Sequence, residues 1–235
     1  MSRKPVVAID GPAGAGKSTV TKRVADELGY LLVDTGALYR TVALAAQRAG
    51  VSWDDGEAMG KFAYVLVNER AVELGYHKTS GLSVKLRGED VSLAIRAPEV
   101  SQGASKVSAV PAVRDALLDM QRQAGAAGGA VLEGRDIGTV VFPNAEAKFF
   151  LTANIDIRAR RRFDELLARG ASPVLVDVQR EVAERDFRDS NRPIAPLKQA
   201  SDACIIDSTT LSIDQVVARI VQRVREVEAE LGARA

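Results

Sequence analysis

The chain has 235 residues, of which 46% are hydrophobic and 27% charged, and its 32 basic and 31 acidic residues leave a net charge of +1. This length and composition are typical of a globular protein with one large core, or with one core and an insertion. The small net charge argues against a surface that coats nucleic acid. One cysteine and one histidine exclude an intramolecular disulfide and a cysteine- or histidine-rich metal site.

The sequence also argues against a membrane protein. It has no apolar run that approaches the roughly 20 residues needed to cross a bilayer. Basic Arg3 and Lys4 are followed at once by Asp10 and a glycine-rich loop, which is unlike a secretory signal peptide. We therefore expect a cytoplasmic, reduced protein that binds neither a membrane nor nucleic acid.

The chain is organised around residues 5–29. Residues 5–10 form a short apolar run, which predicts a buried parallel strand. Residues 11–18 fit the pattern G-x-x-x-x-G-K-[ST], and residues 19–28 carry apolar side chains at helical spacing. The loop therefore has the preceding strand and the following helix that a phosphate-binding loop requires, and this context disfavours a glycine-rich turn in an unrelated fold.

The residue types of this loop suit a polyphosphate. The three glycines allow positive φ angles and a close approach of the backbone, so main-chain N–H groups and the helix N-terminus form a nest for anions. Lys17 adds a mobile charge for the β- and γ-phosphates, and the Ser18 hydroxyl can ligate Mg²⁺. The predicted phosphate-binding residues are Gly11, Pro12, Ala13, Gly14, Ala15, Gly16, Lys17, Ser18 and Thr19.

The next elements continue the same alternation. Residues 30–34 predict a second buried strand, and Thr35 is a suitable N-cap for a helix that ends at Gly50. Asp54 can cap a further helix that extends to about Leu66.

The pattern changes between residues 67 and 95. Residues 71–74 and 82–86 alternate apolar and polar side chains, with turn residues 79–81 between them, and residues 89–92 add a short third strand. Close turns between alternating strands predict a small inserted antiparallel sheet.

The rest of the chain predicts further helices and buried strands. Helices are expected over residues 97–108, 111–125, 155–169 and 174–188, buried strands over 130–133, 147–151 and 203–207, a loop over 137–143, a last helix capped by Ser212 and a frayed charged tail over 226–235. Cys204 lies in the third of these strands and is expected to be a small core side chain.

This order of elements predicts an α/β fold. We expect a five-stranded parallel sheet with helices on both faces, and the small inserted antiparallel sheet in addition. In such a sheet, ligands bind beyond the carboxyl ends of the strands. The segments that follow residues 10, 34, 134 and 151 are therefore expected to converge on one cleft with the glycine loop.

Arginines are frequent near these strand ends. The candidates are Arg40, Arg114, Arg135, Arg185, Arg188 and Arg192. Arginine binds phosphate through two parallel donors, which suits a second phosphate-bearing substrate, although a solvated helix face is the alternative for each. Arg135, directly after a buried strand, and Arg185, in one segment with Asp189, are the best placed. Asp136 and Asp189 can accept hydrogen bonds from sugar hydroxyls or an exocyclic amine.

Five blocks of sequence resemble the bacterial cytidylate kinases, a family of nucleoside monophosphate kinases. They are residues 10–18, 34–40, 134–143, 185–192 and 207–212. The glycine loop alone is widely shared, whereas residues 134–143 together with the other blocks are far more specific. The resemblance covers nearly the whole chain.

The resemblance implies ATP-dependent phosphorylation of CMP and dCMP to CDP and dCDP, with ATP and Mg²⁺ as ligands and a monomeric protein. It also implies one kinase domain in three regions. They are a core of residues 1–62, 110–152 and 193–235, an inserted monophosphate-binding region of residues 63–109, and a lid of residues 153–192 that begins around Arg158.

The resemblance also assigns roles to single residues. By similarity, Ser105, Arg114 and Asp136 face cytosine, Arg40, Arg135 and Arg188 hold the acceptor phosphate together with Arg192, Arg185 and Asp189 contact the sugar, Thr35 contributes to the CMP site, and Arg158 contacts ATP. Lys17, Arg135 and Arg188 are the residues expected to act in catalysis. Thr35 stands where the family often has serine and keeps the hydroxyl, whereas Ala13 lacks one that is common there.

Phosphoryl transfer to CMP needs alignment and charge neutralisation and little covalent chemistry from the protein. The acceptor oxygen is already anionic near neutral pH, because the second pKa of a phosphate monoester is about 6. One alternative is a related kinase acting on UMP, another nucleotide or shikimate. Another is a nucleotide-dependent switch that transfers nothing, but the N-K-x-D motif of GTPases is absent.

Overall fold

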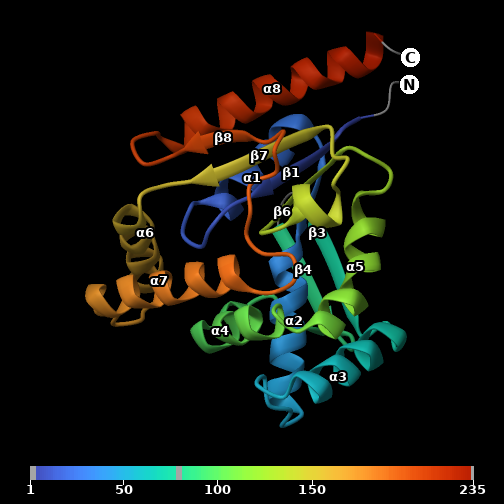
Figure 1. Ribbon diagram of the computed structural model, residues 1–235, viewed down its shortest axis with the longest axis vertical. Helices are drawn as coiled ribbons and strands as arrows, with labels where there is room; N and C mark the ends of the chain where they lie inside the picture. Colours follow the sequence, from blue (N-terminus) through green and yellow to red (C-terminus); the bar gives the residue numbers. More distant parts are fainter. Residues whose placement is uncertain (1–3, 78–80, 234–235) are drawn as a thin grey trace. The chain divides into compact units, whose positions relative to one another are not determined.

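The computed structural model describes residues 4–77 and 81–233. The chain divides into two compact units (Figure 1), a first unit of Met1–Tyr30 with Gly128–Ala235 and a second unit of Leu31–Ala127. The division into core, inserted region and lid stays a prediction.

The first unit contains strands, helices and one π-helical turn. In chain order these are β1 (Val6–Asp10), α1 (Lys17–Leu28), β6 (Ala130–Gly134), the turn η2 (Ile137–Val141), β7 (Ala147–Thr152), α6 (Ile155–Ala168), α7 (Leu175–Asn191), β8 (Cys204–Asp207) and α8 (Ile213–Ala233). Strand β1 pairs in parallel with β6 and with β7, and β7 pairs in parallel with β8.

The large sheet has five strands in the order β2-β6-β1-β7-β8, where β2 is Leu31–Asp34. The apolar run of β1 lies at its centre, and Val7, Ala8 and Ile9 have no exposed surface. Two-sided burial explains why this strand is continuously apolar and does not alternate. The predicted α/β fold with a five-stranded parallel sheet is confirmed.

Helix α1 begins at Lys17, before the expected residue 19, and ends at Leu28, as expected. Gly16 and Gly29 flank it in the left-handed conformation, and the N–H of Gly29 donates to the Ala25 carbonyl. Val20 and Val24 form its buried face, as the helical spacing predicted. The helix N-terminus therefore stands directly after the glycine loop.

Helices α6 and α7 have a small core of their own. Ala159 and Leu166 of α6 pack with Val178 and Val182 of α7, and Phe163 covers them. Of the arginines of α6, Arg160 is exposed and Arg161 and Arg162 are partly exposed, whereas Arg158 is buried. Helix α7 continues to Asn191, beyond the predicted end at residue 188.

Two expectations for the C-terminal part are wrong. Cys204 is exposed, because β8 is the edge strand of the sheet and buries mainly Ile206. The expected frayed tail is helical up to Ala233, since buried Val224 and Val227 continue the apolar face of α8. The predicted cap is confirmed, because the N–H of Gln215 donates to the Ser212 hydroxyl over 3.2 Å.

Residues 137–141 were expected to be loop and instead form the single turn η2. The N–H of Phe142 donates to the Ile137 carbonyl over 2.7 Å, which closes the wide ring of a π-helical turn. Such turns are rare and give no periodic signal in a sequence.

The second unit combines helices with a small sheet. Its elements are β2 (Leu31–Asp34), α2 (Thr35–Arg48), α3 (Gly56–Asn68), β3 (Val72–His77), β4 (Gly81–Leu86), β5 (Glu89–Asp90), the 3₁₀ turn η1 (Ala94–Arg96), α4 (Pro98–Val107) and α5 (Pro111–Gly125). The sheet β3-β4-β5 is antiparallel, as predicted. Of the turn predicted at residues 79–81, only Gly81 lies within the described residues.

The caps of α2 and α3 differ by one residue from the prediction. Asp34, not Thr35, caps α2 by accepting a hydrogen bond from the N–H of Ala37 over 3.0 Å. Asp55, not Asp54, caps α3 through the N–H of Ala58. In each case two residues that can cap a helix are adjacent, and the first helical turn donates to Asp34 in α2 and to Asp55 in α3.

Candidate active site

The glycine loop between β1 and α1 is tightly packed. Gly11, Gly14 and Gly16 all have positive φ angles, of 153°, 74° and 89°. A Cβ on Gly11 would overlap the backbone oxygen of Leu151, and one on Gly14 would lie 2.7 Å from the Arg158 carbonyl oxygen. The loop therefore presents bare backbone on one side while it packs against the chain on the other.

Lys17 lies inside this loop and is 7% exposed. Its Nζ atom donates to the carbonyl oxygens of Gly11 and Pro12, each over 2.7 Å. Burial lowers the pKa of this ammonium well below its usual range, and the Arg135 guanidinium lowers it further, against the opposing effect of Glu133. An anion bound beside Lys17 would stabilise its protonated, positively charged form.

Ser18 and Glu133 form the candidate Mg²⁺ site. The Ser18 hydroxyl donates to Oε2 of Glu133 over 3.0 Å, and Glu133 is a 5% exposed residue of β6. Within the part of the chain that the structure describes, no cluster of three His, Cys, Asp or Glu side chains could hold a metal. One hydroxyl and one carboxylate fit Mg²⁺, which keeps several waters and binds mainly through substrate phosphates.

Glu133 was not among the predicted site residues. The signal that selected Arg135, its position near the carboxyl end of a buried strand, applies equally to Glu133. A glutamate at a strand end has no phosphate-binding chemistry of its own, and only its contact with Ser18 in the folded chain points to a role.

An ion pair joins the residue after β6 to α7, beside Lys17. Nε of Arg135 donates to Oδ2 of Asp189 over 2.8 Å, and Arg185 lies 3.8 Å from the same oxygen. Burial opposes the charge on Arg135, but Asp189, together with Glu133 and Asp186, outweighs burial, and the pKa of the guanidinium is raised. Burial likewise disfavours the Asp189 carboxylate, while Arg135 and then Arg185 lower its pKa overall.

Arg185, like Arg135, lowers the pKa of Lys17 through its charge, so both guanidinium groups act at the phosphate-binding loop. Arg135 and Arg185 are each more than a hundred residues from Lys17 in the sequence, and the fold of the first unit brings the three charges together. Several cations gathered around a glycine loop form a site for a highly charged anion.

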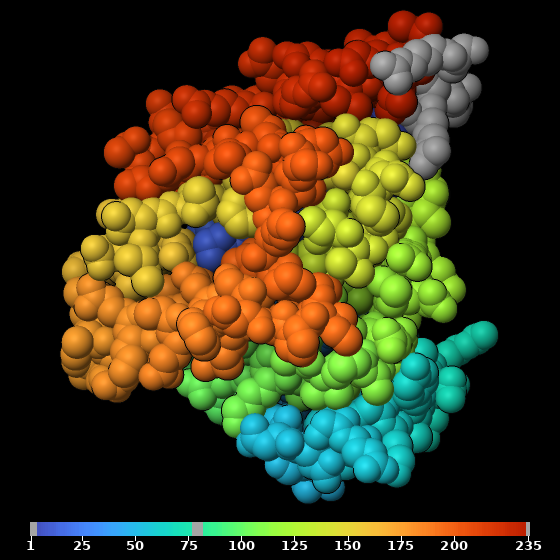
Figure 2. Space-filling model, in the orientation of Figure 1, coloured from blue at the N-terminus to red at the C-terminus, as the bar shows by residue number. Residues whose placement is uncertain are grey.

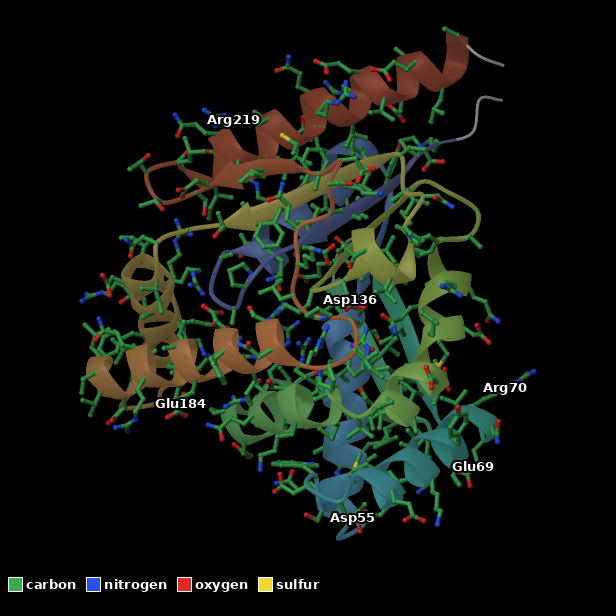
Figure 3. All side chains as sticks on the ribbon, viewed as in Figure 1. Asp55, Glu69, Arg70, Asp136, Glu184 and Arg219 are labelled. Atoms are coloured by element: carbon green, nitrogen blue, oxygen red, sulfur yellow. The ribbon has the colours of Figure 1, made fainter. Side chains whose placement is uncertain are left out.

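A second buried pair lies next to the first. Nη2 of Arg192 lies 3.2 Å from Oδ1 of Asp136, and both residues are at most 7% exposed. Nε of Arg192 also donates to the Ala195 carbonyl over 2.6 Å. Figure 3 labels Asp136 beside the segment that follows α7. The pair therefore fixes the Asp136 carboxylate relative to the end of α7.

Arg158 connects the glycine loop to α6 and α7. Its guanidinium donates to the carbonyl oxygens of Ala153 over 2.9 Å and Ala13 over 3.0 Å, and it pairs with Asp186 over 2.7 Å. Figure 2 shows blue N-terminal atoms ringed by the ochre and orange segments that contain α6 and α7. Arg158 thus lies at the root of the predicted lid and against the loop.

Arg188 differs from its neighbours on α7. It is exposed, whereas Asp189 is buried and Arg185 is partly buried. Its assignment to the acceptor phosphate stays a prediction.

The second unit holds the other predicted residues. Thr35 and Ser105 are each 3% exposed and Arg114 is 6% exposed. The guanidinium of Arg114 lies 5.6 Å from the centre of the Tyr39 ring, a cation–π contact. Arg40 donates to Asp34 over 2.7 Å, and its Nε is buried without a hydrogen-bond partner among the described residues.

Comparison with known proteins identifies the family of this chain. The family model described as cytidylate kinase matches residues 7–226. The chain belongs to the cytidylate kinase family. It is 50% identical to the cytidylate kinase of Syntrophotalea carbinolica over 96% of this chain and 94% of that protein. It is also 50% identical to the cytidylate kinase of Geobacter sulfurreducens, over 95% and 94% of the two chains.

Family membership confirms the predicted class of enzyme, a phosphotransferase of the nucleotide kinases that phosphorylates CMP. A kinase for another acceptor such as UMP is not favoured. Among solved structures, a gluconokinase from Sinorhizobium meliloti 1021 covers 100% of this chain and 99% of its own, with a TM-score of 0.50 and 11% identity. At that identity the likeness concerns the fold alone.

Proposed function

We propose that this kinase binds ATP at residues 11–19 and transfers its γ-phosphate to CMP or dCMP. The observation that carries the proposal is the group of cations at the loop. Lys17 is buried against the loop carbonyls, and the charges of Arg135, directly after β6, and of Arg185 on α7 act on it. Two phosphate-bearing substrates meeting there supply the negative charge that this group requires.

The acceptor half of the site is assigned to residues near the end of β6 and the second half of α7. Arg135 binds the acceptor phosphate, and Arg185 with Asp189 contacts the sugar. Asp136 accepts a hydrogen bond from the exocyclic amine of cytosine, which uracil lacks. The ion pairs of Arg135 with Asp189 and of Arg192 with Asp136 support this, because they orient the charged groups before substrate arrives.

For the second unit, the proposal assigns Thr35, Arg40, Ser105 and Arg114 to CMP. It is supported by the family likeness and by the buried polar character of these residues. The partnerless Nε of Arg40, as far as the described chain shows, is a donor with the chemistry to bind a phosphate oxygen.

No general base is needed for this reaction, since the acceptor is a phosphate oxygen that is anionic near neutral pH. Lys17, Arg135 and Arg188 neutralise charge on the transferring group and hold donor and acceptor in line. Arg158, bound to the glycine loop and to Asp186, couples the loop to α6 and α7. Movement of these helices over the substrates would exclude water and prevent hydrolysis of ATP.

Mg²⁺ would be held by the Ser18 hydroxyl and, through water, by Glu133. When bound, the ion neutralises charge on the β- and γ-phosphates. The chain's own contribution is the orientation of these two groups by their mutual hydrogen bond.

The proposed partners are small nucleotides, and the monomeric state and the cytoplasmic location stay predictions. Within residues 4–77 and 81–233, no helix combines the length and apolar character that a membrane crossing requires.

The experiment is an assay of ADP release with Mg²⁺ and ATP against CMP, dCMP and UMP. We expect turnover with CMP and dCMP and a kcat/KM for UMP lower by one to two decades, because one buried hydrogen bond distinguishes the bases. Equal turnover of UMP, or ATP hydrolysis that no monophosphate stimulates, would contradict the proposal.

A further inference from the structure

The Asp10 side chain reaches across to the turn η2. Its Oδ1 accepts the N–H of Ile137 and its Oδ2 accepts the N–H of Gly138, each over 2.8 Å. Asp10 is the last residue of β1 and is 4% exposed. Both oxygens of one buried carboxylate therefore bind two successive main-chain donors on a segment 127 residues away in sequence.

The segment that Asp10 binds directly follows Asp136. The Asp136 carbonyl accepts the N–H of Val140 over 2.9 Å, so the same turn also closes back on Asp136. Gly138 is closely packed, because a Cβ there would be 3.2 Å from Cδ of Lys148 and 3.5 Å from Oδ2 of Asp10. The backbone after Asp136 is thus held by Asp10 on one side and bounded by Lys148 on another.

Only an ionised carboxylate satisfies this arrangement. Two N–H groups point at the two oxygens, and an amide in the same place would face one of them with its own N–H group. The pKa of Asp10 is raised from 3.8 to about 6, because burial and the charge of Asp136 outweigh the two main-chain donors and Lys17. Near neutral pH the carboxylate is therefore ionised, and both of its oxygens accept the main-chain N–H groups.

We propose that Asp10 is a positioning residue for the acceptor nucleotide, acting through η2 to fix Asp136 and Arg135. The inference depends on the proposed role of Asp136 in binding CMP. It separates two functions at the end of β1, since Gly11 begins the loop for ATP while the side chain of Asp10 serves the other substrate.

The test is Asp10→Asn, assayed for the KM of CMP and the KM of ATP separately. We expect the KM of CMP to rise on the order of tenfold, because one hydrogen bond from a main-chain donor to a charged group is lost, and the KM of ATP to change less than twofold. The matched control is Glu146→Gln, since Oε2 of Glu146 accepts the N–H of Val6 over 2.9 Å at the other end of the same strand. It should leave both constants unchanged.

A double-mutant cycle with Asp136→Asn separates this inference from the proposed function. If Asp10 acts through Asp136, Asp10→Asn raises the KM of CMP in the wild-type background but adds little in the Asp136→Asn background. Fully multiplicative effects, or equal effects on ATP and CMP, would show that Asp10 supports the fold or the glycine loop, and would overturn the inference. If Asp136→Asn leaves the KM of CMP unchanged, the assignment of Asp136 fails and the route through Asp10 fails with it.

Gly138→Ala perturbs the same contact from the other side, so the inference stays testable if Asp10→Asn does not fold. The added methyl group would lie 3.2 Å from Cδ of Lys148 and 3.5 Å from Oδ2 of Asp10, so it crowds this contact and leaves the residues of β1 unchanged. We expect a smaller but equally selective rise in the KM of CMP. A normal KM for CMP in a folded Gly138→Ala protein would contradict the role of η2.

Discussion

Asp189→Asn should destabilise the free protein more than any other change of one carboxylate on α7. Oδ2 of Asp189 lies 2.8 Å from Nε of Arg135 and 3.8 Å from Nε of Arg185, and the Asp189 side chain is 4% exposed. The amide keeps the shape and one acceptor but removes the negative charge between the two guanidinium groups. Removing one partner of a buried ion pair costs about 3–5 kcal/mol of stability. Because the amide keeps one acceptor, we expect Asp189→Asn to lower the free energy of unfolding by ~3 kcal/mol.

The assay is urea unfolding without nucleotide near pH 7, with Asp177→Asn as the matched control. Asp177 lies on the same helix and pairs with Arg180 over 2.6 Å, but the two side chains are 49% and 66% exposed. Exposed pairs contribute at most about 1 kcal/mol. If the two variants are equally stable, the reasoning is refuted, because losing the negative charge between two guanidinium groups would then cost no more than losing an exposed one.

The pH dependence adds a second check on Asp189. Its pKa is lowered in the folded protein, so the stability it contributes is complete above the unfolded value of about 4 and is lost as the pH falls through the folded value. The difference between wild type and Asp189→Asn should therefore decline in acid. A difference that is constant down to about pH 2 would mean that packing, not charge, causes it.

Three other outcomes follow from the structure. Gly11→Ala should fail to give folded protein, because the new Cβ overlaps the backbone oxygen of Leu151; a folded variant with normal melting temperature would contradict the packing of the loop. The pKa of Asp10 is raised from 3.8 to about 6, so between these pH values the folded state binds more protons than the unfolded state. The free energy of unfolding of wild type relative to Asp10→Asn should therefore fall by ~3 kcal/mol as the pH rises from about 4 to about 6. Cys204 is exposed, so it should react with a thiol reagent in the native state at the rate of the unfolded chain, within about tenfold; a protected thiol would place β8 in an interface.

Local chemistry made the first part of the chain predictable. The apolar run of β1, the glycine loop and α1 each depend on residues within a few positions of one another, and the structure has them where the sequence placed them. The alternating pattern of β3 and β4 was equally local, because a period of two needs no information from the rest of the fold.

The errors arise where distant parts of the chain decide the structure. Ile206 is buried and Cys204 is exposed because β8 is an edge strand, and the order of strands in a sheet cannot be predicted from the sequence of one strand. Asp10, at the carboxyl end of β1, holds the turn η2 through two hydrogen bonds, and no local sequence pattern predicts this long-range contact. Asp34 and Thr35 are both good caps, and only the fold of the second unit selects Asp34.

The candidate site shows the same division. The glycine loop and Arg135 could be proposed as site residues from motifs, because phosphate binding needs particular residues at particular spacings. Glu133 and Asp186 could not, because each acts through a partner, Ser18 for one and Arg158 for the other, that only the folded chain brings near.

The most direct test of the account is the kcat/KM for CMP of Arg135→Ala beside that of Arg180→Ala. Arg135 is held by Asp189 near Lys17, whereas Arg180 is an exposed residue of α7. We expect Arg135→Ala to lose one to two decades of kcat/KM, because a charge-assisted hydrogen bond contributes roughly 1.5–3 kcal/mol, and Arg180→Ala to retain wild-type turnover. If Arg135→Ala phosphorylates CMP as fast as Arg180→Ala does, the acceptor site lies elsewhere and the account is wrong.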